Sequence, residues 1–190
     1  MRLAEADFPA GDYAHPVFGE GDPACGVVLI GEAPGREEAE SGRPFVGKAG
    51  RQLDALLDSA GIDRERVYVT NAVKYRPVKR GERSVKNRTP GREELAEALP
   101  LVREQLAVLR PRVIVTLGNT PLNALLTVAG VPVQTVGALH GAAFPIRLAY
   151  GDAALFPLYH PASAIYNPSL LPVLRADAAA LGEHLVKAGL

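Results

Sequence analysis

The residues best suited to chemistry follow a short apolar run. Residues 26–30 are rich in β-branched side chains, which predicts a strand that is buried on both faces. Glu32 comes directly after this strand, and Phe45 follows in a segment rich in glycine and proline. Because ligands of open α/β sheets bind at the carboxyl ends of the strands, an acid and an aromatic ring at this point predict a catalytic pocket.

Polar side chains also follow three further predicted strands, at residues 67–70, 113–117 and 154–159. The residues in question are Asn71, Asn119 and His160. Parallel strands bring their carboxyl ends to one edge of a sheet, so we expect these three residues to converge with Glu32. A carboxylate, an amide and an imidazole would then surround one site.

The elements that must position this site form a repeated strand–helix pattern. Helices are predicted at 47–60, 92–109, 120–128 and 173–187, with a kink or break at Pro100. A strand at 144–148 is expected to form a hairpin with 154–159. The pattern predicts one α/β domain over residues 1–190 with three or four parallel core strands, and an N-terminal arm, residues 1–25, with a short strand near 16–18.

Composition narrows the class of protein. The 190 residues are 47% hydrophobic, and 21 basic side chains balance 21 acidic ones, so a nucleic-acid surface would have to be local. A single cysteine, Cys25, excludes an intrachain disulfide and a multi-cysteine metal site. The chain starts with nothing that resembles a signal peptide, and no apolar run approaches the ~20 residues of a membrane span. We therefore expect a cytoplasmic protein without a membrane partner.

One local basic surface is present. Residues 74–92 carry one acid, Glu82, and eight basic side chains: Lys74, Arg76, Lys79, Arg80, Arg83, Lys86, Arg88 and Arg92. The segment is predicted to be an exposed loop. A solvated face is the ordinary explanation, but this density of charge, with Tyr75 among it, favours contact with DNA or RNA.

Two glycines and a lysine, Gly42, Gly47 and Lys48, have the spacing of a phosphate-binding P-loop. That motif requires Ser or Thr next and a strand directly before the first glycine. Ala49 follows instead, and residues 31–41 separate the motif from its strand. Lys48 is therefore expected to be solvated or to touch a phosphate, and nucleotide hydrolysis is disfavoured.

The candidate site residues also have structural explanations. Glu32 can be an exposed loop acid, Asn71 can cap a turn and Phe45 can pack in the core. His160, before Pro161, can be a structural histidine. Their shared position after strands favours a functional role for the set.

Several motifs together resemble the family 4 uracil-DNA glycosylases, in the same order and with similar spacing from about Val17 to the C-terminus. The matching segments are 31–35 (GEAPG), 42–50 (GRPFVGKAG), 68–71 (YVTN), 87–90 (NRTP), 111–118 and 160–162 (HPA). The resemblance implies an α/β fold, a three-layer α/β/α sandwich around a central, mainly parallel four-stranded sheet, that excises uracil from DNA in base excision repair.

The resemblance also implies roles for individual residues. Glu32 and His160 would be catalytic, the first linked to the attacking water and the second placed beside uracil O2. Substrate would be bound by Gly31, Ala33, Glu38, Phe45 and Asn71. Within this set Glu38 would crowd the pyrimidine C5 edge and reject thymine, Phe45 would stack on the flipped base, and Asn71 would read the uracil edge.

Contact with DNA is expected from two places. The loop 162–169 would enter the minor groove, with Ile165 or Tyr166 as the wedge and Ala164 beside them. The DNA phosphates would be bound by basic side chains: Lys48, Lys79, Arg80, Arg83, Lys86 and Arg88. The expected partner is single- or double-stranded DNA that contains uracil, bound by a monomer.

The chain departs from that family in two respects: its basic segment is longer than expected, and it lacks the family's cysteines. Members of that family usually hold a 4Fe–4S cluster with four cysteines, whereas this chain has Tyr75 at the third position and only Cys25 elsewhere. We expect no cluster, no metal and no other cofactor. Two alternatives stay open: a non-catalytic module that binds DNA or deaminated bases, and a glycosylase that also accepts hypoxanthine or xanthine.

Overall fold

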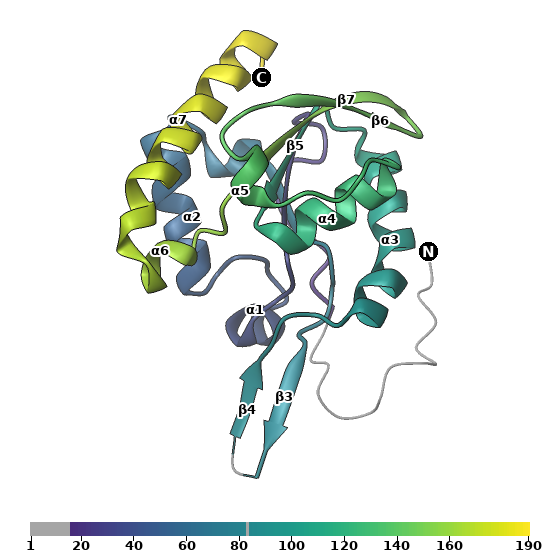
Figure 1. Cartoon of the computed structure of the whole chain (residues 1–190), viewed down its shortest axis with the longest axis vertical. Helices are drawn as coiled ribbons and strands as arrows, with labels where there is room; N and C mark the ends of the chain where they lie inside the picture. The colour runs from purple at the N-terminus through teal and green to yellow at the C-terminus, as the bar shows by residue number, and fades with distance from the viewer. Residues whose placement is uncertain (1–15, 83) are drawn as a thin grey trace.

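A computed structural model describes residues 16–82 and 84–190, which form three layers with a β-sheet in the middle (Figure 1). The sheet has five strands in the order β2-β1-β5-β7-β6. They are β1 (Val27–Gly31), β2 (Tyr68–Asn71), β5 (Val113–Leu117), β6 (Phe144–Leu148) and β7 (Gly151–Leu158). Strands β2, β1, β5 and β7 are parallel, whereas β6 is antiparallel to β7.

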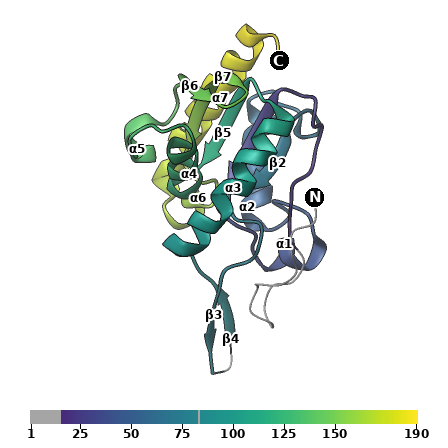
Figure 2. The same ribbon diagram turned by 90° about the vertical axis from the view of Figure 1, so that its right-hand side faces the viewer.

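Two long helices cover each face of the sheet (Figure 2). One face packs against α2 (Lys48–Ser59) and α7 (Leu171–Ala188), and the other against α3 (Arg92–Leu109) and α4 (Asn119–Val128). The short elements are α1 (Arg36–Ser41), α5 (Val136–Leu139), α6 (Ser163–Tyr166), η1 (Arg64–Arg66) and η2 (Pro168–Leu170).

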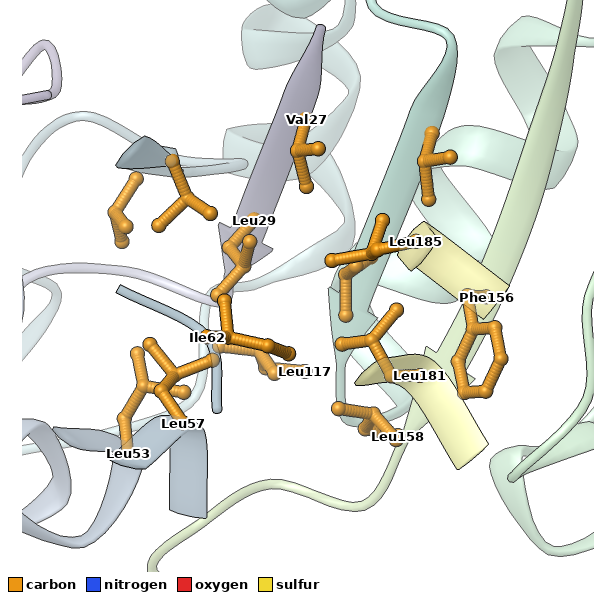
Figure 3. Close-up of a cluster of buried hydrophobic side chains, with 14 of the residues drawn as sticks. Val27, Leu29, Leu53, Leu57, Ile62, Leu117, Phe156, Leu158, Leu181 and Leu185 are labelled. Carbon is orange, nitrogen blue, oxygen red and sulfur yellow. The ribbon is translucent and has the colours of Figure 1, made fainter. Parts of the chain in front are cut away.

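Strand β1 shows why the sheet is central. All five of its residues are buried. Because successive side chains alternate between faces, Val27 and Leu29 join the apolar cluster beneath α2 and α7, which Figure 3 shows, while Ile30 joins the cluster beneath α3 and α4. The continuous apolar run is thus explained by helices on both sides.

The expected count of four strands was wrong, although the parallel core was predicted. Strand β6 is a fifth strand at the edge of the sheet, because the turn at residues 149–150 folds it back on β7. Its pairing runs from Phe144 with Leu155 to Leu148 with Gly151. The hairpin itself was predicted, and the pairing adds it to the main sheet.

The basic segment 74–92 is not the loop that we expected. It contains an antiparallel hairpin of β3 (Val78–Gly81) and β4 (Ser84–Asn87), which projects from the body of the protein (Figure 1). Lys79 pairs with Lys86 across it. Arg83, predicted to contact DNA, lies outside the described residues.

Three smaller differences concern the predicted elements. The strand expected near 16–18 is absent from the described residues, where Glu20 instead makes a single bridge to Val69 on β2. Helix α3 continues without a break through Pro100, which lies on its exposed side. The first 15 residues of the predicted arm lie outside the description. No helix within 16–82 or 84–190 combines the length and apolarity needed to cross a membrane.

Candidate active site

The carboxyl ends of β1, β2 and β7 open into a cavity of about 630 Å³. Many of the residues predicted from the sequence line this cavity: Ala33, Glu38, Phe45, Lys48, Asn71, His160, Ile165 and Tyr166. They come from segments as far apart as β1 and α6. The parallel sheet accounts for their meeting, because it turns the ends of distant strands toward one edge.

The inner end of the cavity depends on a glycine. Gly31 lies opposite Asn71 in the pairing of β1 with β2. A Cβ at Gly31 would lie 2.5 Å from Cζ of Phe45 and closer still to Oδ1 of Asn71. The missing side chain therefore lets the aromatic ring and the amide approach each other.

Phe45 is held in an unusual backbone conformation. Its φ is 56°, in the left-handed region that non-glycine residues rarely adopt, and its side chain is buried. Such conformations persist where the surrounding structure imposes them. The ring lies 6.4 Å, between centroids, from the imidazole of His160 at an interplanar angle of 29°.

Glu38 supplies part of that constraint. One carboxylate oxygen, Oε1, accepts hydrogen bonds from the backbone N–H of Val46 at 3.1 Å and of Gly47 at 2.8 Å. The other, Oε2, accepts from Gly35 N at 3.1 Å. The side chain thus ties the loop after β1 to the loop that carries Phe45, a contact that the sequence did not predict.

Asn71 is fixed by a buried lysine. Asn71 is 2% exposed, and its main-chain oxygen accepts a hydrogen bond from Lys74 Nζ at 2.6 Å. The same Nζ donates to Thr70 Oγ1 at 2.7 Å and to Gln105 Oε1 at 2.6 Å. Because all three partners are uncharged, burial lowers the pKa of Lys74 to about 7. Lys74 is therefore a structural residue and not part of an exposed basic loop.

Glu32 lies half-buried just beyond β1. Its carboxylate oxygen Oε2 accepts a hydrogen bond from Thr120 Oγ1 at 2.6 Å. Its main-chain oxygen accepts from Val73 N at 3.0 Å, which joins the loops after β1 and β2. Both ends of the residue are therefore held.

His160 is arranged as a neutral donor. Its Nδ1 accepts a hydrogen bond from Ala162 N at 3.2 Å, so the proton of the neutral ring lies on Nε2. Burial lowers the pKa of His160, and the charge of Glu32 opposes that effect. The ring consequently stays neutral at pH 7.

Asn119, which we expected to join the site, does not present a free amide there. Its Oδ1 accepts a hydrogen bond from Val136 N at 2.7 Å, which fixes the start of α5. The neighbouring Thr120 reaches Glu32 instead. The signal available in the sequence was its position directly after a strand, but that signal could not separate two adjacent polar residues.

The cavity has a further wall, which comes from β4 and the segment before the hairpin: Arg76, Val85, Lys86 and Asn87. Lys86 was predicted to contact DNA, whereas no site role was predicted for the other three. Arg76 Nε donates to Asn87 Oδ1 at 2.7 Å. The hairpin therefore faces the same cavity as Ile165 and Tyr166 on α6.

The residues predicted to contact DNA fall into different environments. Lys79 and Arg80 are exposed on the hairpin, and Ala164 is half-buried in α6. Arg88 is engaged within the protein, because its Nη1 and Nη2 donate to the carboxylate of Glu94 at 2.5 and 2.8 Å. Of the basic side chains predicted to contact DNA, only some are therefore available to bind phosphates.

The cavity presents the flat ring of Phe45, the buried amide of Asn71 and the neutral imidazole of His160. These groups are suited to binding a planar heterocycle with hydrogen-bonding edges. The model of the uracil-DNA glycosylase superfamily matches residues 18–181. The chain belongs to this superfamily. The matched region includes every element that lines the cavity.

One relative is the type-4 uracil-DNA glycosylase of Pyrobaculum aerophilum. It is 39% identical to this chain over 163 residues, which cover 86% of this chain and 80% of the relative. The type-4 enzyme of Thermotoga maritima is 39% identical over 153 residues, 80% and 73% of the two chains. The type-5 uracil-DNA glycosylase of Thermus thermophilus is 34% identical over 163 residues, 78% and 69%.

Proposed function

We propose that this protein is a uracil-DNA glycosylase, an enzyme that hydrolyses the bond between uracil and deoxyribose in DNA and so starts base excision repair. One observation carries the proposal. In a chain of this superfamily, Asn71 and His160 follow different strands and line one cavity beside Phe45, and Glu32, at the end of a third strand, lies close enough for its charge to act on His160.

The target nucleotide must leave the double helix before the bond can be reached, at a cost of a few kcal/mol. Ile165 and Tyr166 are 43% and 88% exposed at the edge of the cavity. Apolar side chains inserted between base steps offset the loss of stacking. We assign that wedge to these two residues.

Recognition of the flipped base rests on Asn71, Phe45 and Glu38. The amide of Asn71 has a donor for the carbonyl O4 of uracil and an acceptor for its N3–H, whereas cytosine presents the opposite pattern. The ring of Phe45 stacks on the base, which is worth roughly 1–3 kcal/mol. Glu38, held by three backbone N–H groups, cannot move aside for the methyl group of thymine.

The chemistry is a hydrolysis. When the bond between C1′ and N1 breaks, its electron pair goes to the uracil ring, and the oxygen O2 accepts a hydrogen bond from Nε2 of His160. The ionised carboxylate of Glu32 faces the positive charge that develops on the sugar. Glu32 also orients a water molecule and takes its proton as the new bond from oxygen to C1′ forms.

The residues present do not fit the iron–sulfur cluster that the family resemblance implies. The whole sequence has one cysteine, and the thiol of Cys25 donates to the main-chain oxygen of Val27 at 3.0 Å. The described residues contain no group of three His, Cys, Asp or Glu side chains placed to hold a metal ion. Tyr75 replaces the third thiolate, and burial raises its pKa. No step of the proposed hydrolysis therefore passes through a cluster.

Phosphate contacts are assigned to the exposed cations beside the cavity. Lys48 begins α2 at its rim, and Lys79, Arg80 and Lys86 lie on the hairpin. Arg83 belongs to the same segment of the sequence. Such contacts contribute affinity without reading bases.

Excision from a duplex with one U·G pair tests the proposal. Glu32→Gln and His160→Ala should each slow single-turnover excision by about 10²–10³-fold, since each removes a group aimed at developing charge. Binding of the same duplex should change little. Glu183→Gln is the matched control, because this acid is exposed on α7. Wild-type rates in both site variants would remove Glu32 and His160 from the chemistry.

A further inference from the structure

The hydroxyl of Thr120 makes a contact that nothing in the sequence indicated. Thr120 Oγ1 donates to Oε2 of Glu32 at 2.6 Å, although 88 residues separate the two in the chain. Hydrogen bonds to ionised carboxylates are short, and this distance fits that class. A hydroxyl has one proton to give, so the carboxylate receives it at one oxygen only.

The position of Thr120 is itself rigid. It is the second residue of α4, which starts after Gly118 at a backbone φ of 99°. Gly118 N donates to the main-chain oxygen of Leu158 at 2.8 Å, and a Cβ on Gly118 would lie 3.3 Å from Cβ of His160. This close turn places the first residues of α4 between the ends of β1 and β7.

Asn119, the residue before Thr120, also anchors the start of α4. Oδ1 of Asn119 accepts a hydrogen bond from Val136 N at 2.7 Å, which ties the start of α4 to α5. The start of a helix also favours a nearby negative charge. Thr120 therefore presents its hydroxyl to Glu32 from a helix end that is anchored on two sides.

We propose that Thr120 is a positioning residue for the hydrolytic step. By engaging Oε2, it holds the Glu32 carboxylate in one orientation and leaves Oε1 free to orient the attacking water. The inference rests on the role proposed above for Glu32. Thr120 is not among the residues that line the cavity, so its loss should change the rate of the chemical step and not the affinity for DNA.

Replacement by an isosteric side chain without a hydroxyl tests this role. Thr120→Val should lower kcat for a U·G duplex by about 10–100-fold, in line with one hydrogen bond to a charged group, with KM within about twofold of wild type. Thr120→Ser keeps the hydroxyl and should retain most of the activity. Thr127→Val is the matched control, because Thr127 lies on the same helix and its Oγ1 donates to Asn123 O at 2.7 Å.

The Glu32→Gln background separates the two proposals. If Thr120 acts through Glu32, Thr120→Val should cause little further loss in Glu32→Gln, whereas independent losses that multiply would overturn the inference. Activity of Thr120→Val equal to wild type, or a change confined to KM, would also overturn it while leaving the role of Glu32 intact. Full activity of Glu32→Gln would instead remove the proposed mechanism.

Folding of each variant is checked by thermal unfolding. Thr120→Ala serves as a second variant if Thr120→Val does not fold, and the same loss of kcat is expected from it. Wild-type kcat in Thr120→Ala would contradict the inference as directly as wild-type kcat in Thr120→Val.

Discussion

The inner wall of the cavity and the β3–β4 hairpin both border the cavity, but they are built in opposite ways. Gly31, Phe45 and Asn71 are buried and held by contacts from distant parts of the chain. The hairpin strands pair only with each other, and their residues are exposed apart from the half-buried Val78. Excision of a base needs atoms in one geometry, whereas attraction of a phosphate backbone needs only charge. The inner wall should therefore tolerate little change and the hairpin much.

The largest effect is expected at the inner wall from one added methyl group. Gly31→Ala would bring a Cβ within 2.5 Å of the Phe45 ring and closer to the Asn71 amide, so one of the two must move. Displacements of about 1 Å cost on the order of 10²-fold in rate, and we expect at least that loss in single-turnover excision.

The hairpin supplies the matched control for this change. A Cβ at Gly81 meets nothing closer than 3.4 Å, so Gly81→Ala should excise uracil at nearly the wild-type rate. Equal losses in the two alanine variants would show that the inner wall and the hairpin are constrained alike.

An intermediate effect is expected on stability from the lysine beneath Asn71. Lys74 has a pKa of about 7 in the folded protein and 10.5 when unperturbed, so between these values the unfolded chain binds a proton that the folded protein does not. The free energy of unfolding should therefore rise with pH from 7 toward 10.5, by up to about 1.4 kcal/mol per unit.

Lys74→Met should remove this contribution. Urea unfolding of both proteins between pH 7 and 9 measures the difference, in which the other titrating groups cancel. Parallel stability curves would mean that Lys74 keeps its charge in the folded protein and that burial does not lower its pKa.

The smallest effect is expected on the hairpin. Replacing Lys79, Arg80 and Lys86 by glutamine should weaken DNA binding and reduce the slope of log K against log salt by about 1 for each lost phosphate contact. Excision at saturating DNA should stay near the wild-type rate. Fluorescence anisotropy at several salt concentrations measures the slope, with Arg147→Gln as the control, because Arg147 is an exposed cation on β6 that pairs with Asp152 on β7.

The sequence alone determined the elements that carry the site. The apolar runs predicted β1, β2 and β5 to within a residue or two, because a short segment rich in β-branched residues has few alternatives to a buried strand. The rule that parallel strands end at one edge then predicted that Glu32, Asn71 and His160 would converge. Both inferences need only local sequence and a general property of α/β sheets.

The tertiary structure decided which partner each polar side chain meets. Nothing local distinguishes Asn119, which binds the backbone of Val136, from Thr120, which binds Glu32. The sequence predicts Lys74 in an exposed basic loop, but Lys74 is buried because Gln105 on α3 and Thr70 on β2 surround it. A hydrogen bond depends on the position of both groups, and residues tens of positions away in the chain supply one of them. Patterns in one segment therefore predict strands and their ends, while the contacts that orient a catalytic group are determined by the packing of the whole domain.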